Sequence, residues 1–364
     1  SVVEVGNGNY VVRSFFWGNG GIANAGAVTW GSGTAGVVGT ISASNSLVGT
    51  TANDQVGSSG ITVLSNGNYV VRSVNWSGGR GAVTWGSGNT GVSGAVSASN
   101  SLVGSTANDQ VGIGGVTALS NGNYVVRSEY WSGNRGAVTW GDGTNGTSGV
   151  VGASNSLVGT TVDDRVGSGG ITALSNGNYV VRSHLWDNGA ATDAGAVTWG
   201  SGSAGVSGVV SASNSLVGTT ANDRVGSTGT TALSNGNYVV RSHNWNGSRG
   251  AVTWGDGTNG TSGVVSASNS LVGSTANDLV GSGSITVLSN GNYVVNSPFW
   301  DNGGIVNAGA VTWGSGTAGV SGAVSASNSL VGSTANDSVG DGGITALSNG
   351  NYVVNSPFWD NGGI

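Results

Sequence analysis

The chain has 364 residues, including 72 Gly and 13 Trp but no Cys or Met, and only 7 % of its residues are charged, against about a quarter in an ordinary soluble domain. The formal net charge is -6 and all ten basic residues are Arg, without a basic patch of the kind that binds nucleic acid. This composition excludes a disulfide framework and a thiolate metal site. No apolar run approaches the ~20 residues of a membrane helix, so we expect neither nucleic-acid binding nor membrane insertion.

One hexapeptide, NGNYVV, occurs seven times, and its tyrosine recurs every 55 or 59 residues, at Tyr10, Tyr69, Tyr124, Tyr179, Tyr238, Tyr293 and Tyr352. A fixed period of this length is the signature of a repeat architecture. We therefore predict a single repeat domain over residues 1–364. Its units are expected at residues 1–59, 60–114, 115–169, 170–228, 229–283 and 284–342, with a half unit at 343–364.

Within each unit the apolar residues form short β-branched and aromatic runs bounded by Gly, Asn or Ser, which is typical of strands and tight turns. In the fourth unit these runs are, in chain order, ITAL at 171–174, YVVRS at 179–183, GAVTWG at 195–200 and SLVG at 215–218. They predict a four-stranded antiparallel meander. The Ser-Asn-Gly-Asn segment between the first two strands, as at 65–68, predicts a type I′ hairpin.

Both faces of the third strand carry side chains that can pack, as in a sheet that lies between two neighbouring sheets. Four short strands in each of seven units predict an all-β fold, a seven-bladed β-propeller of four-stranded antiparallel blades whose last blade is incomplete. Closure into a ring would protect most of the sheet edges. The alternative is a tandem array drawn out into a superhelix.

The order of motifs within a unit resembles a known repeat. TANDRVG at 220–226 is followed by a strand, a hairpin, YVVRS or YVVNSP, then WDNG, AGAVTWG and SLVG. This order is similar to the FG-GAP repeat of integrin α-subunit propellers, with Val-Gly in place of Phe-Gly and Asn-Ser-Pro at 296–298 and 355–357 in place of Gly-Ala-Pro. The resemblance implies a seven-bladed propeller that serves as a scaffold for binding, with the loops after the second strand on the ligand-binding face.

The calcium loop of that family is replaced here by the short Ser-Asn-Gly-Asn turn, which offers no carboxylate, whereas calcium takes six to eight oxygen ligands. We therefore predict no calcium at this turn, no other metal and no cofactor. One carboxylate recurs with the repeat, always directly after an Asn or another Asp. We expect it to accept backbone N–H groups in a turn rather than to bind a metal; it is present as Asp54, Asp109, Asp164, Asp223, Asp278 and Asp337.

The loop after the second strand differs most between units, and each copy begins near a Trp that we call a loop tryptophan. These seven residues are candidates for stacking on a sugar or a partner's side chain: Trp17, Trp76, Trp131, Trp186, Trp245, Trp300 and Trp359. We favour the alternative that each wedges between blades and donates its indole N–H to a loop carbonyl, which makes the variable neighbouring residues the better ligand candidates. Further ligand-binding candidates in these loops are Arg80, Arg135, Arg249, His184 and His243, although a loop Arg can simply be solvated.

A second set, the strand tryptophans, lies inside the third strand and is predicted to serve packing: Trp30, Trp85, Trp140, Trp199, Trp254 and Trp313. Catalysis has little support, because neither His has the spaced carboxylate and nucleophile of a triad and no Lys follows the GSG or GDG turns. We therefore predict that the chain is not an enzyme.

Two functions remain. The first is a non-catalytic extracellular binding or adhesion module that takes a glycan or a surface protein through the loops after the second strand. The second is a structural repeat protein of a bacterial cell surface or extracellular assembly, without a dedicated ligand. The Gly, Asn, Ser and Thr bias resembles secreted bacterial repeat proteins, so we expect a location outside the cell. The incomplete last blade has an open edge, which predicts self-association there.

Overall fold

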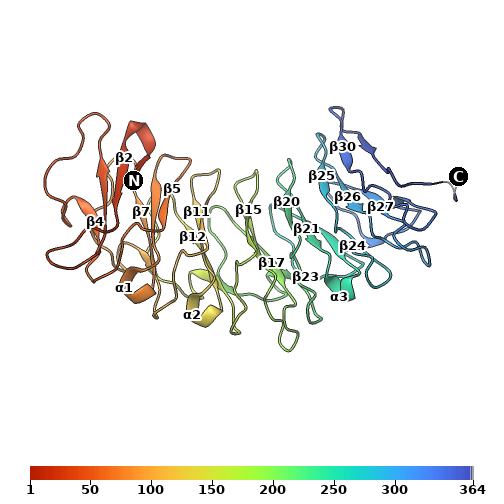
Figure 1. Ribbon diagram of the computed structural model, residues 1–364, viewed down its shortest axis with the longest axis horizontal. Helices are drawn as coiled ribbons and strands as arrows, with labels where there is room; N and C mark the ends of the chain where they lie inside the picture. The colour runs from red at the N-terminus through yellow and green to blue at the C-terminus, as the bar shows by residue number, and fades with distance from the viewer. Residues whose placement is uncertain (361, 363–364) are drawn as a thin grey trace. The chain divides into compact units, whose positions relative to one another are not determined.

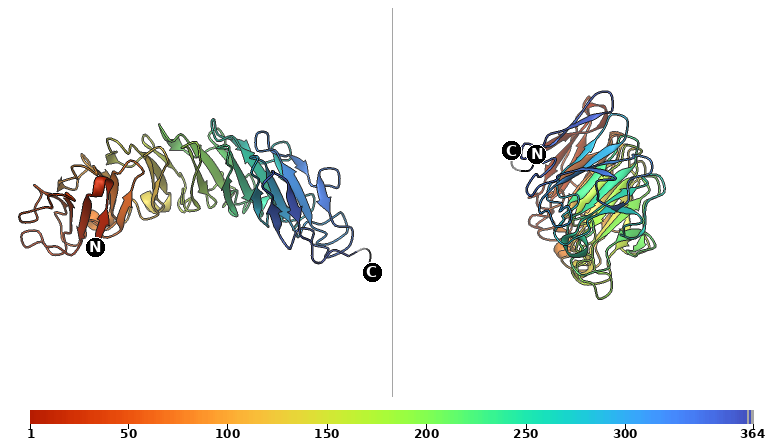
Figure 2. Two further views of the ribbon diagram at one scale, coloured as in Figure 1. Left: turned by 90° about the horizontal axis from the view of Figure 1, so that it is seen from above. Right: turned by 90° about the vertical axis from the view of Figure 1, so that its right-hand side faces the viewer.

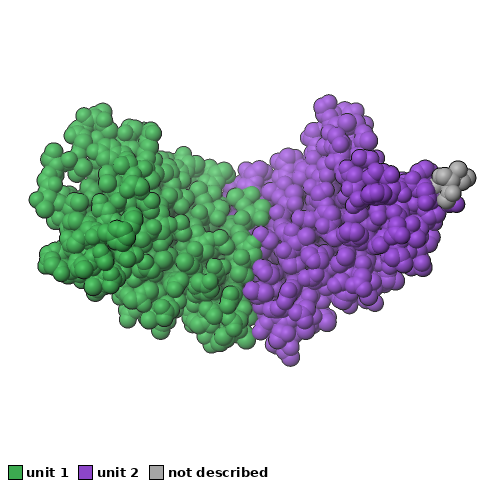
Figure 3. Space-filling view, in the orientation of Figure 1, with its two compact units in different colours: residues 1–173, 200–209 green, residues 174–199, 210–364 purple. Residues whose placement is uncertain are grey.

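The computed structural model describes residues 1–360 and 362, and strands and turns make up nearly all of that part of the chain (Figure 1). It divides into two compact units, residues 1–173 with 200–209 and residues 174–199 with 210–364 (Figure 3). Helical structure in the described part is limited to single turns: η1 (Gly6–Gly8), α1 (Trp76–Gly79), α2 (Trp131–Asn134) and α3 (Trp245–Ser248). The predicted all-β repeat fold is confirmed.

The first unit contains three sheets of five strands, in the orders β1-β2-β3-β4-β8, β13-β9-β7-β6-β5 and β10-β11-β12-β14-β18. Its strands are β1 (Val2–Glu4), β2 (Tyr10–Ser14), β3 (Ala27–Gly31), β4 (Ser46–Val48), β5 (Gly60–Val63), β6 (Tyr69–Ser73), β7 (Ala82–Gly86), β8 (Gly94–Ala95), β9 (Leu102–Val103), β10 (Gly115–Ala118), β11 (Tyr124–Ser128), β12 (Ala137–Gly141), β13 (Gly149–Val150), β14 (Ser156–Val158), β15 (Gly170–Ala173) and β18 (Gly208–Val209).

The second unit repeats this pattern, with sheets in the orders β20-β21-β22-β24-β28 and β25-β26-β27-β29 and a final two-stranded sheet, β30-β31. Its strands are β16 (Tyr179–Ser183), β17 (Ala196–Gly200), β19 (Ser215–Val217), β20 (Gly229–Ala232), β21 (Tyr238–Ser242), β22 (Ala251–Gly255), β23 (Gly263–Val264), β24 (Ser270–Val272), β25 (Ile285–Val287), β26 (Tyr293–Ser297), β27 (Ala310–Gly314), β28 (Gly322–Ala323), β29 (Ser329–Val331), β30 (Ile344–Ala346) and β31 (Tyr352–Val354).

The predicted four-stranded antiparallel meander is confirmed in each complete sheet, but most sheets gain a fifth strand. In the second repeat, β5, β6, β7 and β9 pair antiparallel in sequence order. The fifth strand, β13, comes from the next repeat and pairs parallel to β9, with Gly149 opposite Leu102. The second to sixth repeats each add one short strand to the preceding repeat's sheet. This strand could not be predicted from the sequence because two residues are too short for an apolar alternation.

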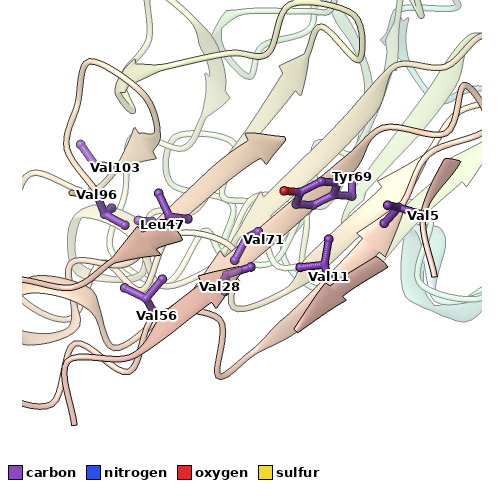
Figure 4. Packing of buried hydrophobic residues seen from close by; sticks show 10 residues of the cluster. Val5, Val11, Val28, Leu47, Val56, Tyr69, Val71, Val96 and Val103 are labelled. Atoms are coloured by element: carbon purple, nitrogen blue, oxygen red, sulfur yellow. The ribbon is translucent and has the colours of Figure 1, made fainter. Parts of the chain in front are cut away.

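Each hydrophobic core lies between the sheets of two successive repeats (Figure 4). Val11, Val28 and Leu47 from the first repeat pack with Tyr69 and Val71 from the second. Side chains alternate along a strand, so the residue between the last two, Val70, joins the next core, with partners from the third repeat. Both faces of a sheet are therefore buried, and within each unit the sheets stack in chain order (Figure 2).

The hairpin between the first two strands forms as predicted, but the type I′ turn is wrong for the segment Ser65–Asn68. Type I′ requires positive φ at both Asn66 and Gly67, whereas only Gly67 has it, at +84°. The Oδ1 atom of Asn66 instead accepts the N–H of Asn68, at 3.1 Å. This local turn leaves the Nδ2 group of Asn66 free to reach the next repeat.

The turn after the third strand of each repeat presents one backbone carbonyl to the preceding repeat, and we call its residue the junction glycine. The carbonyl of Gly143 accepts hydrogen bonds from Nδ2 of Asn66 at 2.8 Å, Nδ2 of Asn68 at 2.8 Å and Nε1 of Trp85 at 3.0 Å. The other junction glycines also bind a strand tryptophan: Gly88, Gly202, Gly257 and Gly316. Strand tryptophans pack against the cores between repeats, as predicted, and their indole N–H groups also connect repeats.

The junction requires glycine because two backbone segments meet there. A methyl group on Gly143 would collide with the carbonyl oxygen of Gly122, whereas one on Gly152 would meet nothing within 4 Å. Neither glycine has a positive φ, so the two positions differ in the room available for a methyl group and not in the sign of φ.

We predict that Gly143→Ala lowers the free energy of unfolding by about 1–3 kcal/mol, the usual cost of overpacking. The matched change Gly152→Ala is expected to leave it unchanged or slightly raised, because Ala restricts the unfolded chain more than Gly does. Urea denaturation followed by circular dichroism measures both. Equal losses in the two variants would show that the close approach at the junction does not contribute to stability.

Candidate ligand-binding site

The variable loops and the Asn-Asp turns lie at the same edge of each sheet. In the second repeat, Ala82 at the start of β7 pairs with Ser73 at the end of β6 and with Val103 at the end of β9. The loop after β6 and the turn after β9 therefore leave the sheet side by side. We call this edge the loop face; α1 and α2 mark it along the first unit (Figure 1).

The recurring Asp is a buried acceptor of hydrogen bonds, as predicted. Asp109 is 1 % exposed and accepts the backbone N–H groups of Ser105 and Thr106, both at 2.8 Å, and the Thr106 hydroxyl at 2.8 Å. It also accepts the N–H of Ser132, at 2.9 Å, from the loop of the next repeat. The carboxylate thus fixes its own turn and the neighbouring loop together.

In the sixth repeat, hydrogen bonds of this kind favour the ionised form of the recurring Asp, Asp337. At Asp337 burial acts to raise the pKa, but hydrogen bonds from Thr334, Ser333 and Asp360 outweigh it and lower the pKa to about 2. Among the described residues, no group of three or more His, Cys, Asp or Glu side chains is placed to hold a metal ion.

The residue that follows this Asp is half-buried at the loop face and has a left-handed backbone conformation. Its φ lies between 43° and 49° in every copy, although its identity changes: Gln55, Gln110, Arg165, Arg224, Leu279 and Ser338. A left-handed conformation is unfavourable for residues other than Gly and tends to occur where function requires it. This position was not among the predicted sites; its signal was a variable residue directly after the recurring Asp.

A groove of about 430 Å³ lies between the first and second of these turns. Amide side chains line it on both sides, with Gly78 and Gly79 of α1 between them: Asn53, Gln55, Asn75, Asn108 and Gln110. Nδ2 of Asn75 donates to Oε1 of Gln55 at 2.8 Å, and the backbone N–H of Gln110 donates to the carbonyl of Gly79 at 2.9 Å. Backbone and amide hydrogen bonds therefore hold the walls of the groove in place. The hydrogen-bond donors and acceptors that line it carry no formal charge.

A smaller groove of about 240 Å³ occupies the equivalent place in the second unit, lined by Asn222, Arg224, Asn244 and Ser248. Here Arg224 forms an ion pair with Asp193, at 2.7 Å. The two grooves thus share position and backbone but differ in charge, because the residue after the Asp differs.

The repeats of this chain identify the family to which it belongs. Seven segments match a family model described as a repeat of unknown function (DUF5650): residues 4–58, 63–113, 118–168, 173–227, 232–282, 287–341 and 346–364. The chain belongs to this family. A solved structure titled "Streptogramin B lyase structure" is similar at a TM-score of 0.34 and 10 % identity, over 81 % of this chain and 74 % of that one. The search of curated proteins found no match.

The loop tryptophans lie beside the grooves rather than in them. Trp76, Trp131 and Trp245 pack against the cores between repeats, Trp186 and Trp300 are 4 % and 2 % exposed, and Trp17 is half-buried whereas Trp359 is exposed. Nε1 is buried without a hydrogen-bond partner in Trp131, Trp186 and Trp300, so the predicted bond from these indoles to a loop carbonyl is wrong. Their role in ligand binding stays a prediction.

The three predicted Arg candidates differ in exposure and in hydrogen bonding. Arg80 is exposed, Arg135 donates to the carbonyl of Thr160 at 3.0 Å, and Arg249 is half-buried, with an Nε that has no partner among the described residues. None of the three lines a groove described above.

A helix long and apolar enough to span a membrane is absent from the described residues.

Both His candidates are partly buried near the end of the second strand. Burial lowers the pKa of His184, and the guanidinium groups of Arg182 and Arg224 lower it further. Burial and Arg241 likewise lower the pKa of His243, whose ring contacts the Thr228 hydroxyl. The folded protein therefore favours neutral imidazoles at both positions.

This shift makes stability depend on pH. Because both folded pKa values lie below the unfolded value of 6.5, the unfolded chain binds more protons in acid. We predict that the free energy of unfolding is nearly constant above about pH 7.5 and falls as the pH decreases through 6.5 toward 5. Urea denaturation at each pH measures it, and the double variant His184→Asn/His243→Asn should remove most of the decrease. A decrease of the same size in the double variant would contradict this assignment.

Proposed function

We propose that this repeat protein is a non-catalytic extracellular binding module whose loop face binds an uncharged glycan. The observation that supports it most is the amide-lined groove between Asn53 and Gln110 in the first unit. Its volume of about 430 Å³ falls within the range of about 300–1,000 Å³ that is usual for small-molecule sites.

The chemistry of the groove favours sugar hydroxyls. An amide offers a donor and an acceptor together, and each sugar hydroxyl both donates and accepts. The side chains of Asn108 and Gln110 make no hydrogen bond with another described residue, so their amides are available to a ligand. The backbone presets their position, which reduces the entropy lost on binding.

Two further points support a binding role. The residue after each buried Asp is Gln, Arg, Leu or Ser, while the Asp itself is retained in all six copies, so this variation lies at the loop face. The resemblance to FG-GAP repeats also favours recognition at this face. The alternative, a structural surface protein without a ligand, is favoured by the near-identity of the units and by the hydrogen bonds that join them.

The test is a glycan array with the full chain, followed by calorimetry on the glycans that bind. We expect the double variant Gln55→Ala/Gln110→Ala to bind about 10- to 100-fold more weakly, because each lost hydrogen bond is worth about 1 kcal/mol. Ala replaces Gln at both left-handed positions without a change in the backbone, so we expect the double variant to retain the fold.

The matched control is Ser338→Ala, which changes the equivalent position of the sixth repeat and leaves the groove intact. It should bind as the wild-type chain does. Failure of the chain to bind any glycan would support the structural alternative, and equal binding by the double variant would place the site elsewhere.

A further inference from the structure

The edge of the sheets opposite the loop face contains a second kind of pocket. At this edge Gly86 ends β7 and pairs with Tyr69 at the start of β6, next to the hairpin turns and the turns with the junction glycines. We call it the turn face. The residue before Gly86 is the strand tryptophan Trp85, so these indoles lie close to this edge.

Two similar pockets occur side by side at the turn face of the first unit. One, of about 200 Å³, is lined by Trp85, Ser99 and Asn100 of the second repeat and by Asn145, Thr147 and Ser148 of the third. The other, of about 210 Å³, has the same plan one repeat later: Trp140, Ser154 and Asn155 are joined by Gly205, Val206 and Ser207. Thr147 lines both, so the pockets are neighbours in a row.

The indole in each pocket is held rigidly. Trp85 Nε1 donates to the carbonyl of Gly143 at 3.0 Å, and Trp140 Nε1 donates to the carbonyl of Gly202 at 2.9 Å. Both rings are half-buried, so part of each remains accessible. A fixed aromatic surface binds with little loss of entropy, and its electron-rich face attracts the C–H groups of a sugar ring.

Polar groups around these rings are uncharged and partly unused. The hydroxyls of Ser148, Ser154 and Ser207 make no hydrogen bond with another described residue. Nδ2 of Asn100 donates one bond, to the carbonyl of Ala95 at 2.9 Å, which leaves its second N–H for a ligand. No Asp, Glu, Arg or His lines either pocket, so an anionic ligand would find no counter-charge.

We propose that the turn face binds an extended, uncharged polysaccharide, with one sugar ring in each Trp pocket. The volumes, about 200 and 210 Å³, are below the range of about 300–1,000 Å³ for drug-sized ligands, which limits each pocket to a single ring. The shared Thr147 places the pockets in line, and a chain that engages both gains affinity through effective concentration. A β-1,4-linked chain is suitable because it is straight and ribbon-like. This site lies on a different edge from the groove of the proposed function and does not depend on it.

The test is titration calorimetry of the full chain with uncharged β-1,4-linked oligosaccharides of glucose, mannose and N-acetylglucosamine, from mono- to hexasaccharides. We expect at least one series to bind, with the hexasaccharide about tenfold or more tighter than the disaccharide because it reaches both pockets. The double variant Ser148→Phe/Ser207→Phe fills the pockets with exposed side chains and should weaken binding at least about tenfold. The milder Ser148→Ala/Ser207→Ala should weaken it about 5- to 30-fold through the loss of two hydrogen bonds, without a steric change.

The control is Gln55→Ala/Gln110→Ala at the loop face, which should bind these oligosaccharides as the wild-type chain does. The proposal is overturned if none of the three series binds, if affinity does not depend on chain length, or if the Phe variant binds normally while its melting temperature is unchanged. Loss of binding in the loop-face control would move the site to that face. Tighter binding of a proline-rich peptide than of any oligosaccharide would also overturn it.

Discussion

The structure depends on one carbonyl per repeat. At one junction, two Asn side chains and one Trp indole of one repeat converge on the carbonyl of Gly143 in the next. The Oδ1 atom of Asn68 meanwhile accepts the N–H of Gly88, the junction glycine of its own repeat, at 2.9 Å. A single Asn therefore connects its own turn to the next one, and the same arrangement recurs at Asn123 and Asn237. This contact involves only successive repeats. In repeat proteins of this kind, stability is approximately a sum over the repeats and the interfaces between neighbouring repeats.

The other constraints act across the same interfaces. The cores consist of residues from two successive sheets, the fifth strand of a sheet comes from the following repeat, and the buried Asp binds the next repeat's loop. No repeat can satisfy its own polar groups or bury its own apolar faces alone. Contacts between successive repeats fix the residues of the interior, whereas residues at the two edges of the sheets can vary. The candidate sites lie at these edges.

Much of this could be predicted from the sequence because it is local and repeated. The period located the units, the β-branched runs gave the four strands in their order, and the isolated Asp gave a hydrogen-bond acceptor in a turn. What escaped prediction involves contacts between repeats. The turn at Asn66 is not type I′ because its side chain serves the next repeat, and the role of Trp85 depends on a glycine 58 residues later. The grooves were missed because Gln55 and Gln110 come together only when successive repeats are stacked.

The central claim is that the hydrogen bonds at the junction glycine hold successive repeats together. It is tested most directly by comparing Trp85→Phe with Trp313→Phe in urea denaturation. Trp313 occupies the equivalent position of the sixth repeat, is 46 % exposed and has no hydrogen bond to another described residue. We expect Trp85→Phe to cost about 1 kcal/mol or more for the lost N–H···O bond, and Trp313→Phe to stay within about 0.5 kcal/mol of the wild-type chain. Equal effects of the two substitutions would contradict the account.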